Sequence, residues 1–487
     1  MTVWLVAQPT RGLFIERCIA RLIGTTVGAL IGGVLLIAFF DNPTALLLAL
    51  VLWVMLCAGV GSTLRHFRSY AAVLAGYTAS VVGLFSLTDA DPDFTQAYAR
   101  MAATTIGVLV SAASSYFFSV RGASFDLQAR VERMVDDCLC WCNLPTEARD
   151  NRTGRARRKV LLRESSKLEK VLDNDAAGSL TERRLLHVYR QKLWQAMAAM
   201  AETVVSVEPH TQPRHGLMGD VLPDWHLVWT AAARPSTALL MAGAVWLLSA
   251  WKHGPIMVMT AAIFSSLFSS NERASHALRG VMWGTLSGAL LGMTFRVLAP
   301  PAAGSYVATV LMLIPFLTLG AVMMAQPSTA KIAIDMNMSF LLVAQPTFPL
   351  PELSSDVIAQ AAAMLAGVAF AWLSMQLYSI SADAQTRRLA RRMRHLARGL
   401  VEETSSRQHL RYCQTIVETG LLVASRETDE VAADAALACV GWAVQLQRSR
   451  LIQQETQEAP DAATCAEKLI SAANNLIDCI STQRRSK

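Results

Sequence analysis

Long apolar runs are the feature that most restricts how this chain can fold. Each run is about 17 to 23 residues long, and roughly 20 apolar residues in a helix cross the ~30 Å hydrocarbon core of a bilayer. The runs are uniformly apolar, whereas a lipid-facing barrel strand would alternate. Only 17% of the residues are charged, against about a quarter in a soluble domain. The sequence therefore predicts an all-α integral membrane protein.

The apolar runs form two groups, which are separated by a polar stretch. The runs lie at about residues 19–40, 44–61, 69–87 and 98–119, and then at about 235–251, 254–270, 279–298, 304–324, 328–345 and 357–378. The polar stretches read as amphipathic helices. We expect four parts: a first transmembrane half (1–120), a cytoplasmic helical region (121–228), a second transmembrane half (229–378) and a C-terminal cytoplasmic helical region (379–487).

A short phrase near the start of the chain recurs in its second half. "GTTVGALIGG" occupies residues 24–33, and "GTLSGALLG" occupies residues 284–292, so that 260 residues separate Gly24 from Gly284. The same shift moves the four runs of the first group onto the last four runs of the second. This register predicts a tandem repeat of two six-helix halves with the same orientation in the membrane.

The first of these halves is incomplete in the sequence. Only four full runs are visible there, and the opening "MTVWLVAQPTRG" is too short to span a bilayer. Shifted by 260, residues 1–7 fall inside the run at 254–270. We expect the first half to lack about one and a half helices, which leaves about ten full spans, and we infer that some 25 to 35 residues are absent. The alternative is a ten-span variant with a short cytoplasmic leader.

Basic residues mark alternate connections between the runs. The connections "FFDNPT" and "LTDADPDFT" carry no Lys or Arg, and Lys252 and Arg296 are the exceptions to the alternation. By the positive-inside rule, the basic side is cytoplasmic. We expect a multi-pass membrane protein with both polar regions and the C-terminus in the cytoplasm. The residues on the basic side are Arg11, Arg17, Arg21, Arg65, Arg68, Arg121, Arg234, Arg273, Arg279, Lys331 and Arg387.

The glycines of the repeated phrase are spaced four residues apart. This spacing places them on one helix face, where small residues allow a second helix to approach closely. Helix packing is the interpretation that we favour, and we expect Thr25 and Thr285 to bond back to the preceding helical turn. The glycines are Gly24, Gly28 and Gly32 in the first copy and Gly284, Gly288 and Gly292 in the second.

Asp335 is a carboxylate inside an apolar run, one to two turns from the cytoplasmic face. Such groups are costly in a membrane and commonly face a cavity or a partner. One interpretation is a structural pair with Lys331, four residues earlier on the same helix face. The other is a carboxylate that takes up and releases a proton, or gates an anion, with Asn337 lining the path. The counterpart of Asp335 at a shift of 260 is Ala75.

Cationic and aromatic side chains gather at the expected cytoplasmic mouth. The cations could attract an anionic substrate, although positive-inside anchoring explains them as well. The aromatic rings could stack on a substrate, although such rings are also common at membrane interfaces. The candidate cations are Arg21, Arg68 and Arg279, and the aromatic residues are Tyr70, Tyr77 and Trp283.

Other classes of function have little support in the sequence. There is no P-loop pattern, which disfavours ATP-driven transport, and no nucleophile motif, so that we do not expect an enzyme or a cofactor. Cys138 and Cys142 lie one helical turn apart, but a second ligand pair is lacking, so buried thiols are favoured over a metal site. The arginines that follow the spans suit anionic headgroups better than nucleic acid.

Several blocks of the chain form a recognisable pattern. In the first half these are "AQPTRG", with Gln8, Pro9 and Arg11, then "RLIGTTVGALIG" and "RSYAAVLAGYTASVVGL". In the second half they are "WKHGPIMVMTAAIFSSLFSS", "IPFLTLGAVMMAQPSTA" and "DMNMSFLLVAQP". Together these blocks resemble the fusaric acid resistance family of inner-membrane exporters, and the resemblance covers roughly residues 1 to 400. It departs from the family pattern at the start, where the family's opening one and a half helices are absent.

This resemblance implies export of aromatic carboxylic acids or related hydrophobic weak acids from the cytoplasm. It also implies a periplasmic membrane-fusion adaptor and an outer-membrane channel as partners, and the absence of a nucleotide site favours proton motive force as the energy source. Two alternatives are a passive anion channel of similar architecture and a non-transporting membrane scaffold. The sequence leaves open the substrate, the adaptor and whether the protein forms a homodimer.

Overall fold

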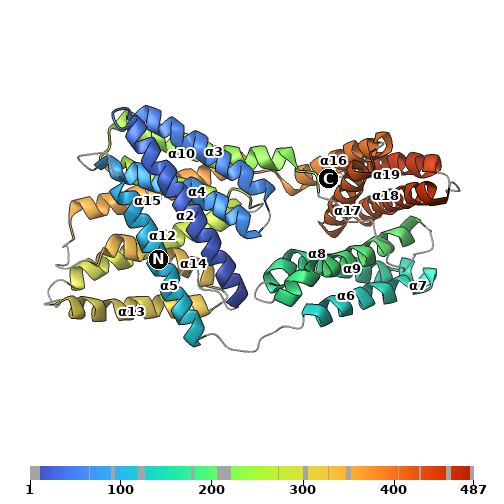
Figure 1. Ribbon diagram of the computed structural model, residues 1–487, viewed down its shortest axis with the longest axis horizontal. Coiled ribbons are helices and arrows are strands. Elements are labelled where there is room, and N and C mark those ends of the chain that lie inside the picture. Colours follow the sequence, from blue (N-terminus) through green and yellow to red (C-terminus); the bar gives the residue numbers. More distant parts are fainter. Residues whose placement is uncertain are drawn as a thin grey trace. The chain divides into compact units, whose positions relative to one another are not determined.

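A computed structural model describes most of the chain as helices (Figure 1). Over the described residues there are eighteen α-helices and two short 3-10 helices, and no strand. The all-helical expectation is therefore confirmed there. The described residues are 11–64, 66–88, 94–118, 127–176, 180–205, 221–271, 274–299, 305–326, 328–346, 353–403, 405–426, 429–456 and 462–482. Residues 1–10, with Gln8 and Pro9, and Arg65, Arg121 and Arg273 lie outside them, and so do the side chains of Arg11 and Lys331.

The chain divides into two compact units, each built from two separate stretches of sequence. Residues 1–120 and 224–379 form one unit, which we call the membrane unit. Residues 121–223 and 380–487 form the other, which we call the polar unit. The two polar stretches thus pack together, which the sequence left open.

Each of the ten apolar runs coincides with a helix of the membrane unit. Six of these helices (α2, α3, α10, α12, α13 and α15) are long and apolar enough to cross a membrane. The apolar helices α11 and α14 have only 14 and 15 residues, and α4 and α5 are not among the six. The bounds are α2 Arg11–Phe39, α3 Pro43–Thr63, α4 His66–Phe85, α5 Thr95–Phe118, α10 Trp225–Ser249, α11 Gly254–Leu267, α12 Ala274–Leu298, α13 Tyr306–Ala325, α14 Ala330–Ala344 and α15 Ser355–Leu377, with a 3-10 turn at Ser86–Thr88.

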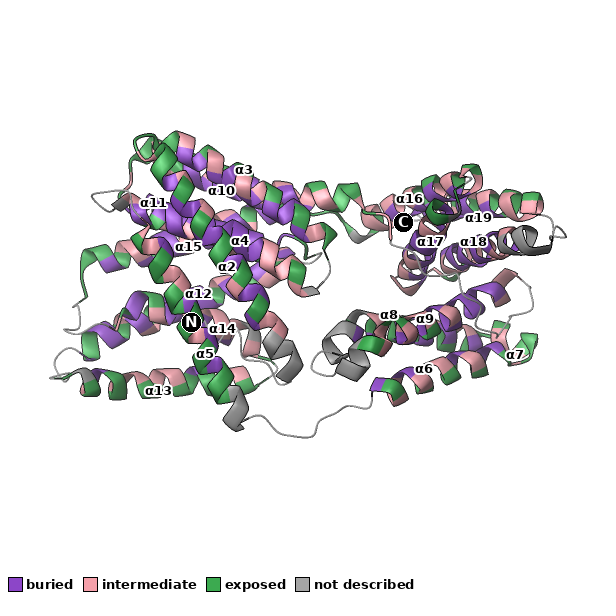
Figure 2. Ribbon diagram, in the orientation of Figure 1, coloured by how far each residue is buried: buried purple, intermediate pink, exposed green. Residues whose placement is uncertain are grey.

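The outer faces of these helices are apolar, as a lipid environment requires. On α2 an exposed stripe at helical spacing runs through Ile19, Ile23, Val27, Leu30 and Val34, while the glycines of the same helix face inward. The helix α13 is buried over only 11% of its most apolar segment, and Figure 2 shows it almost wholly in the colours of exposed and intermediate residues. Contiguous apolar surface of this extent is rare on soluble proteins.

The two copies of the glycine phrase make matching contacts. A Cβ added to Gly24 would lie 2.5 Å from the carbonyl oxygen of Ala71, and one added to Gly284 would lie 2.7 Å from that of Ile332. Backbone occupies the space of a side chain at both positions, so the helix pairs α2–α4 and α12–α14 approach as closely as glycine allows. The remaining glycines of the phrase, Gly28, Gly32, Gly288 and Gly292, contact the same partner helices further along.

Two details differ from the sequence expectations. A Cβ on Gly24 would meet the Cβ of Leu74, and a Cβ on Gly284 would meet that of Asp335. Leu74, and not Ala75, is therefore the counterpart of Asp335, because the second copy has one more residue between the paired helices. In addition, the buried Thr285 hydroxyl has no hydrogen-bond partner among the described residues, whereas a bond to the preceding turn was expected.

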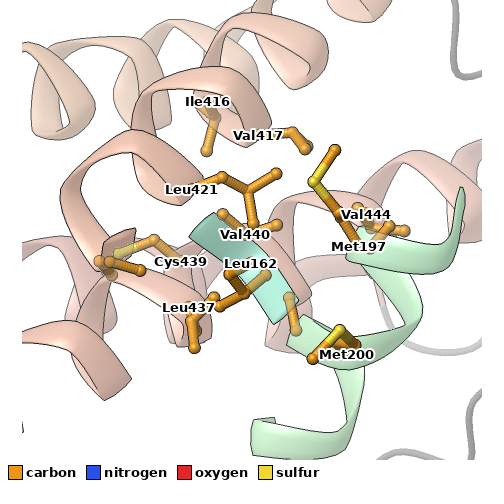
Figure 3. Packing of buried hydrophobic residues seen from close by; sticks show 14 of the residues in the cluster. Leu162, Met197, Met200, Ile416, Val417, Leu421, Leu437, Cys439, Val440 and Val444 are labelled. Carbon is orange, nitrogen blue, oxygen red and sulfur yellow. The ribbon is translucent and has the colours of Figure 1, made fainter. Parts of the chain in front are cut away.

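The polar unit consists of helices from both polar stretches around a single core. The bounds are α6 Leu127–Cys142, α7 Thr146–Asp150, α8 Arg152–Ala176, α9 Leu180–Glu202, α16 Ala382–Glu402, α17 Ser406–Arg426, α18 Glu430–Thr456 and α19 Ala462–Thr482, with a 3-10 turn at Thr203–Val205. Met197 of α9 and Leu162 of α8 belong to the same buried cluster as Leu421, Leu437 and Val440 (Figure 3). The core therefore holds the two stretches together through apolar burial.

Partly buried ionic contacts also join the two polar stretches. Arg158 of α8 pairs with Asp434 of α18. Glu202, which is 1% exposed, accepts a hydrogen bond from the Gln445 side chain at 3.0 Å and pairs with Arg448 at 3.2 Å. Removing one partner from such a pair leaves an uncompensated buried charge, so these contacts favour this arrangement of the two stretches.

Two of the three cysteines of the "CLCWC" segment, Cys138 and Cys142, are buried in the core of the polar unit, whereas Cys140 is exposed. The Cys138 sulfur lies 3.7 Å from the Ser165 hydroxyl. Burial raises the pKa of Cys138 to about 11 and that of Cys142 to about 12. Both thiols therefore keep their protons at neutral pH, and their role is packing.

Candidate functional site

Arg21 is a buried cation on the helix that carries the first glycine phrase. Its side chain points from α2 toward α4, and only 3% of the residue is exposed. Nη1 donates a hydrogen bond of 2.8 Å to the hydroxyl of Tyr70. The guanidinium of Arg17, one turn earlier, lies 5.9 Å from the centre of the same tyrosine ring. Tyr70 is thus held between two arginines.

Tyr77 and Arg100 extend this group further along α4. Tyr77 lies two turns after Tyr70, is 4% exposed, and is close enough to Tyr70, Arg21 and Arg100 to interact with each electrostatically. Arg100 comes from α5 and is half-buried. We call Arg21, Tyr70, Tyr77 and Arg100 the arginine–tyrosine cluster.

The arginine–tyrosine cluster contains guanidinium groups with buried hydrogen-bond donors that no described group accepts. The Nε atoms of Arg21 and Arg100 are buried and have no hydrogen-bond partner among the described residues. A buried guanidinium needs an anion or several acceptors to offset its desolvation. Arginine forks match carboxylates in geometry, and tyrosine rings offer faces for stacking. The cluster is therefore suited to hold an aromatic anion.

Sequence reasoning missed Arg100, although a signal was present. Arg100 is the one charged residue in the run 98–119, and an ionisable residue inside a membrane segment is a candidate functional residue by default. A shift of 260 from Arg100 gives Gln360, so the repeat itself does not mark this position.

Three of the expected mouth residues do not join the cluster. Arg68 and Arg279 are exposed, and Trp283 is 66% exposed on the outer face of α12. These positions suit anchoring at the membrane interface. Arg21, Tyr70 and Tyr77 are the predicted residues that the structure brings together.

Asp335 lies apart from the cluster, at the crossing of α12 and α14. It is half-buried, and its Cβ faces Gly284. Its carboxylate has no hydrogen-bond or ion-pair partner among the described side chains. The Lys331 side chain, its expected partner, is outside the described part, so their pairing stays a prediction.

Asn337 points toward a different helix from Asp335. It is 1% exposed, its amide nitrogen lies 3.8 Å from the Met324 sulfur, and it fills the space that Gly320 of α13 leaves open. In this conformation Asn337 packs α14 against α13. Asp335 and Asn337 therefore do not form one polar patch.

Arg296, an exception to the charge rule in the sequence, has a structural role. The residue is 3% exposed at the last turn of α12. Its Nε donates to the Val343 carbonyl at 2.6 Å, and Nη2 donates to the Gln345 side-chain oxygen at 2.8 Å. Arg296 thus binds the C-terminal end of α14, where carbonyl groups lack helical partners.

Together, the apolar outer faces, the close helix crossings and the buried cationic cluster define a multi-span helical membrane protein with an anion-compatible interior. A family model described as "Fusaric acid resistance protein family" matches residues 1–216 and 174–487. The chain belongs to this family, as its sequence blocks indicated.

Curated relatives share part of the chain. The p-hydroxybenzoic acid efflux pump subunit AaeB of Escherichia fergusonii is 29% identical over 134 residues, which cover 27% of this chain and 20% of the relative. The subunit of the same name from Escherichia coli strain HS is 28% identical over 130 residues, 26% of this chain and 20% of the relative. The match thus spans a fifth of the length of these relatives. No solved structure matches the chain.

Proposed function

We propose that the protein exports aromatic carboxylic acids or related hydrophobic weak acids across the bacterial inner membrane. The observation that carries the proposal is the arginine–tyrosine cluster, in which two arginines lie beside tyrosine rings and the buried Nε atom of each arginine has no hydrogen-bond partner among the described residues. Membership in a transport family and the name of the AaeB relatives, which includes p-hydroxybenzoic acid, support the same class of substrate.

In this proposal each part of the substrate meets a matching group. Arg21 and Arg100 bind the carboxylate by charge-assisted hydrogen bonds, which are strong in a site that excludes water. The Tyr77 ring packs on the aromatic ring of the substrate, and the Tyr70 hydroxyl holds Arg21 in position. A neutral analogue of equal size lacks the charge and binds more weakly.

The architecture that we propose for transport is a tandem repeat of two six-helix halves. The corresponding glycine contacts of α2–α4 and α12–α14 support it. The polar unit and the C-terminus lie in the cytoplasm, in keeping with the basic connections. A periplasmic membrane-fusion adaptor and an outer-membrane channel complete the efflux system, and the word "subunit" in the relatives' name supports such partners.

We further propose that proton motive force drives export and that Asp335 carries the proton. Asp335 is a half-buried carboxylate in an apolar helix, without a partner among the described side chains. Asp335→Asn is then expected to abolish coupled efflux while the protein still inserts into the membrane. Full efflux from this variant would remove Asp335 from the mechanism.

Accumulation of a panel of aromatic acids in cells with and without the gene tests the proposed function. We expect lower accumulation when the gene is expressed, and loss of that difference when an uncoupler dissipates the proton gradient. Unchanged accumulation of every compound would overturn the proposal and leave the scaffold interpretation.

A passive anion channel is the second candidate function. The separation of the arginine–tyrosine cluster from Asp335 favours it, because the two lie on different helix groups and conduction needs no proton carrier. Flux that continues in the presence of the uncoupler would support the channel over the coupled exporter.

A further inference from the structure

A cavity lies at the end of the membrane unit where α4 ends and α11 and α15 begin. Its volume is about 260 Å³, just below the ~300–1,000 Å³ of pockets for drug-sized ligands. It is therefore of a size for a small, single-ring molecule. In the expected orientation this end faces away from the cytoplasm. The lining residues are Leu84, Phe85, Lys252, His253, Pro255, Ile256, Met259, Asp356 and Gln360.

The cavity has an apolar floor and a charged rim. Leu84, Ile256 and Met259 supply aliphatic surface, whereas Lys252 and Asp356 stand at the rim with 75% and 58% of their side chains exposed. Such a combination of apolar walls with a few charged groups is typical of sites for small amphipathic ligands.

Asp356 contacts both basic residues of the rim. One carboxylate oxygen lies 3.5 Å from the Lys252 ammonium, and the other lies 3.3 Å from Nε2 of His253. The pair with Lys252 is long and exposed, so it holds the ammonium only weakly. His253 is fixed more firmly, because its side chain is 9% exposed and its ring stands edge-on to Trp251 at 6.1 Å. Lys252 is thus the mobile cation of the rim.

One face of α4 connects this cavity to the arginine–tyrosine cluster. Tyr70, Tyr77 and Leu84 are spaced seven residues apart, which places them on the same face of the helix, and Leu84 follows Tyr77 by about 10 Å along the axis. The partner along this face is α11. Ile263 of α11 packs against the group that contains Tyr77, and Met259, one turn earlier, lines the cavity.

We propose that this cavity is a second binding site for the exported single-ring carboxylic acid. The acid occupies the cavity before it is released on the far side of the membrane. Lys252 binds the carboxylate, and Leu84, Ile256 and Met259 contact the ring. Asp356 competes with the substrate for Lys252, so that the bound acid leaves readily. This inference rests on the proposed function, since it takes the substrate class from it. It also accounts for Lys252, a cation on the side of the protein that is otherwise poor in basic residues.

Photolabelling of the purified full chain in lipid nanodiscs with 4-azidobenzoate tests the site. We expect label in residues 252–259 or 356–360. An excess of p-hydroxybenzoate should prevent this labelling, whereas p-hydroxybenzyl alcohol, its neutral analogue, should not. Absence of label from both segments, or equal prevention of labelling by the alcohol, would overturn the proposal.

Two variants of the rim test the roles of its charges in opposite directions. Lys252→Gln should lower labelling of the cavity by about ten-fold, as expected for the loss of one favourable charge contact. Asp356→Asn should raise it, because the competing carboxylate is gone while an amide can still accept hydrogen bonds from Lys252. Lys192→Gln, which changes an exposed lysine of the polar unit, is the matched control. Unchanged labelling in both rim variants, when both fold normally, would contradict the site.

Efflux from cells separates this proposal from the proposed function. Cavity label that is competed by p-hydroxybenzoate, together with no efflux of any aromatic acid, would refute the exporter but keep the binding site. Efflux by the wild-type protein that is unaffected in Lys252→Gln, with no label in the cavity, would refute the site and keep the exporter.

Discussion

Arg21 of α2 donates a hydrogen bond of 2.8 Å to the hydroxyl of Tyr70 on α4. This bond fixes a buried guanidinium between two helices that glycine brings into close contact. Removing the acceptor by Tyr70→Phe should leave Arg21 less well oriented and lower substrate affinity by about 10-fold, the order of one hydrogen bond to a charged group. Uptake of the acid into membrane vesicles, measured over a range of acid concentrations, gives the affinity of each protein. An affinity equal to that of the wild type would show that the bond has no part in binding.

The glycine contact between α12 and α14 should be sensitive to a single methyl group. A Cβ at Gly288 would overlap the carbonyl oxygen of Met336, whereas a Cβ at Gly280 on the same helix would meet nothing closer than 4.0 Å. Gly288→Ala is expected to lower the free energy of unfolding by about 1 to 3 kcal/mol. Gly280→Ala, its control, should be neutral or slightly stabilising. Thermal unfolding of both proteins in detergent checks this, and equal Tm values would contradict the close crossing.

Glu202 should contribute strongly to the stability of the polar unit. It is 1% exposed and contacts Gln445 and Arg448 of the other polar stretch. Glu202→Gln leaves Arg448, whose side chain is 27% exposed, without its charge partner, and we expect a loss of about 1 to 3 kcal/mol, the order of an unpaired buried polar contact. Glu132→Gln breaks an exposed pair with Lys192 and should cost at most about 1 kcal/mol. Similar denaturation midpoints for the two variants would argue against the pairing.

Acid should destabilise the polar unit through His409. Burial lowers the pKa of His409 below its ordinary value of 6.5, and Arg450 acts in the same direction, while Gln447 and Glu403 oppose it. As the pH falls below 6.5, the unfolded chain binds the proton first. The free energy of unfolding is therefore highest above that pH and falls below it, by at most about 1.4 kcal/mol per pH unit.

The variant His409→Gln should show a smaller loss of stability between neutral and acidic pH than the wild type. His395→Gln, which changes an exposed histidine of α16, should leave the pH dependence as it is. Unfolding of the purified protein by denaturant across this pH range provides the measurement. A slope that is the same in all three proteins would mean that His409 is not the group that titrates.

The apolar runs predicted the helices of the membrane unit, and six of these helices are long and apolar enough to cross a membrane, because the hydrocarbon core sets a minimum length and an apolar composition for a span. The glycine phrase likewise marked the helices that cross most closely, since backbone contact requires the absence of a side chain at Gly24 and Gly284. The counterpart of Asp335 was misplaced by one residue, because a one-residue difference in a connection is invisible when a single shift is applied to a whole repeat.

Contacts between segments that are distant in the sequence could not be predicted from it. Nothing in the pattern around Arg100 indicates that it lies near Tyr77 of another helix. The pairing of Glu202 with Arg448 joins two polar stretches that the second group of apolar runs separates in the sequence. Arg296 stood out in the sequence as a misplaced charge, but only its hydrogen bonds to Val343 and Gln345 reveal its role at the end of α14. Helices follow from local composition, whereas sites depend on which helices meet.

Flux of p-hydroxybenzoate through the purified protein in proteoliposomes tests the central claim most directly. We expect flux of the acid but not of p-hydroxybenzamide. Flux of the acid should be lost in the variants Arg21→Gln and Arg100→Gln. It should persist in Arg68→Gln, whose arginine is exposed. Wild-type levels of flux in both Arg21→Gln and Arg100→Gln would contradict the assignment of the arginine–tyrosine cluster as the site that binds the transported acid.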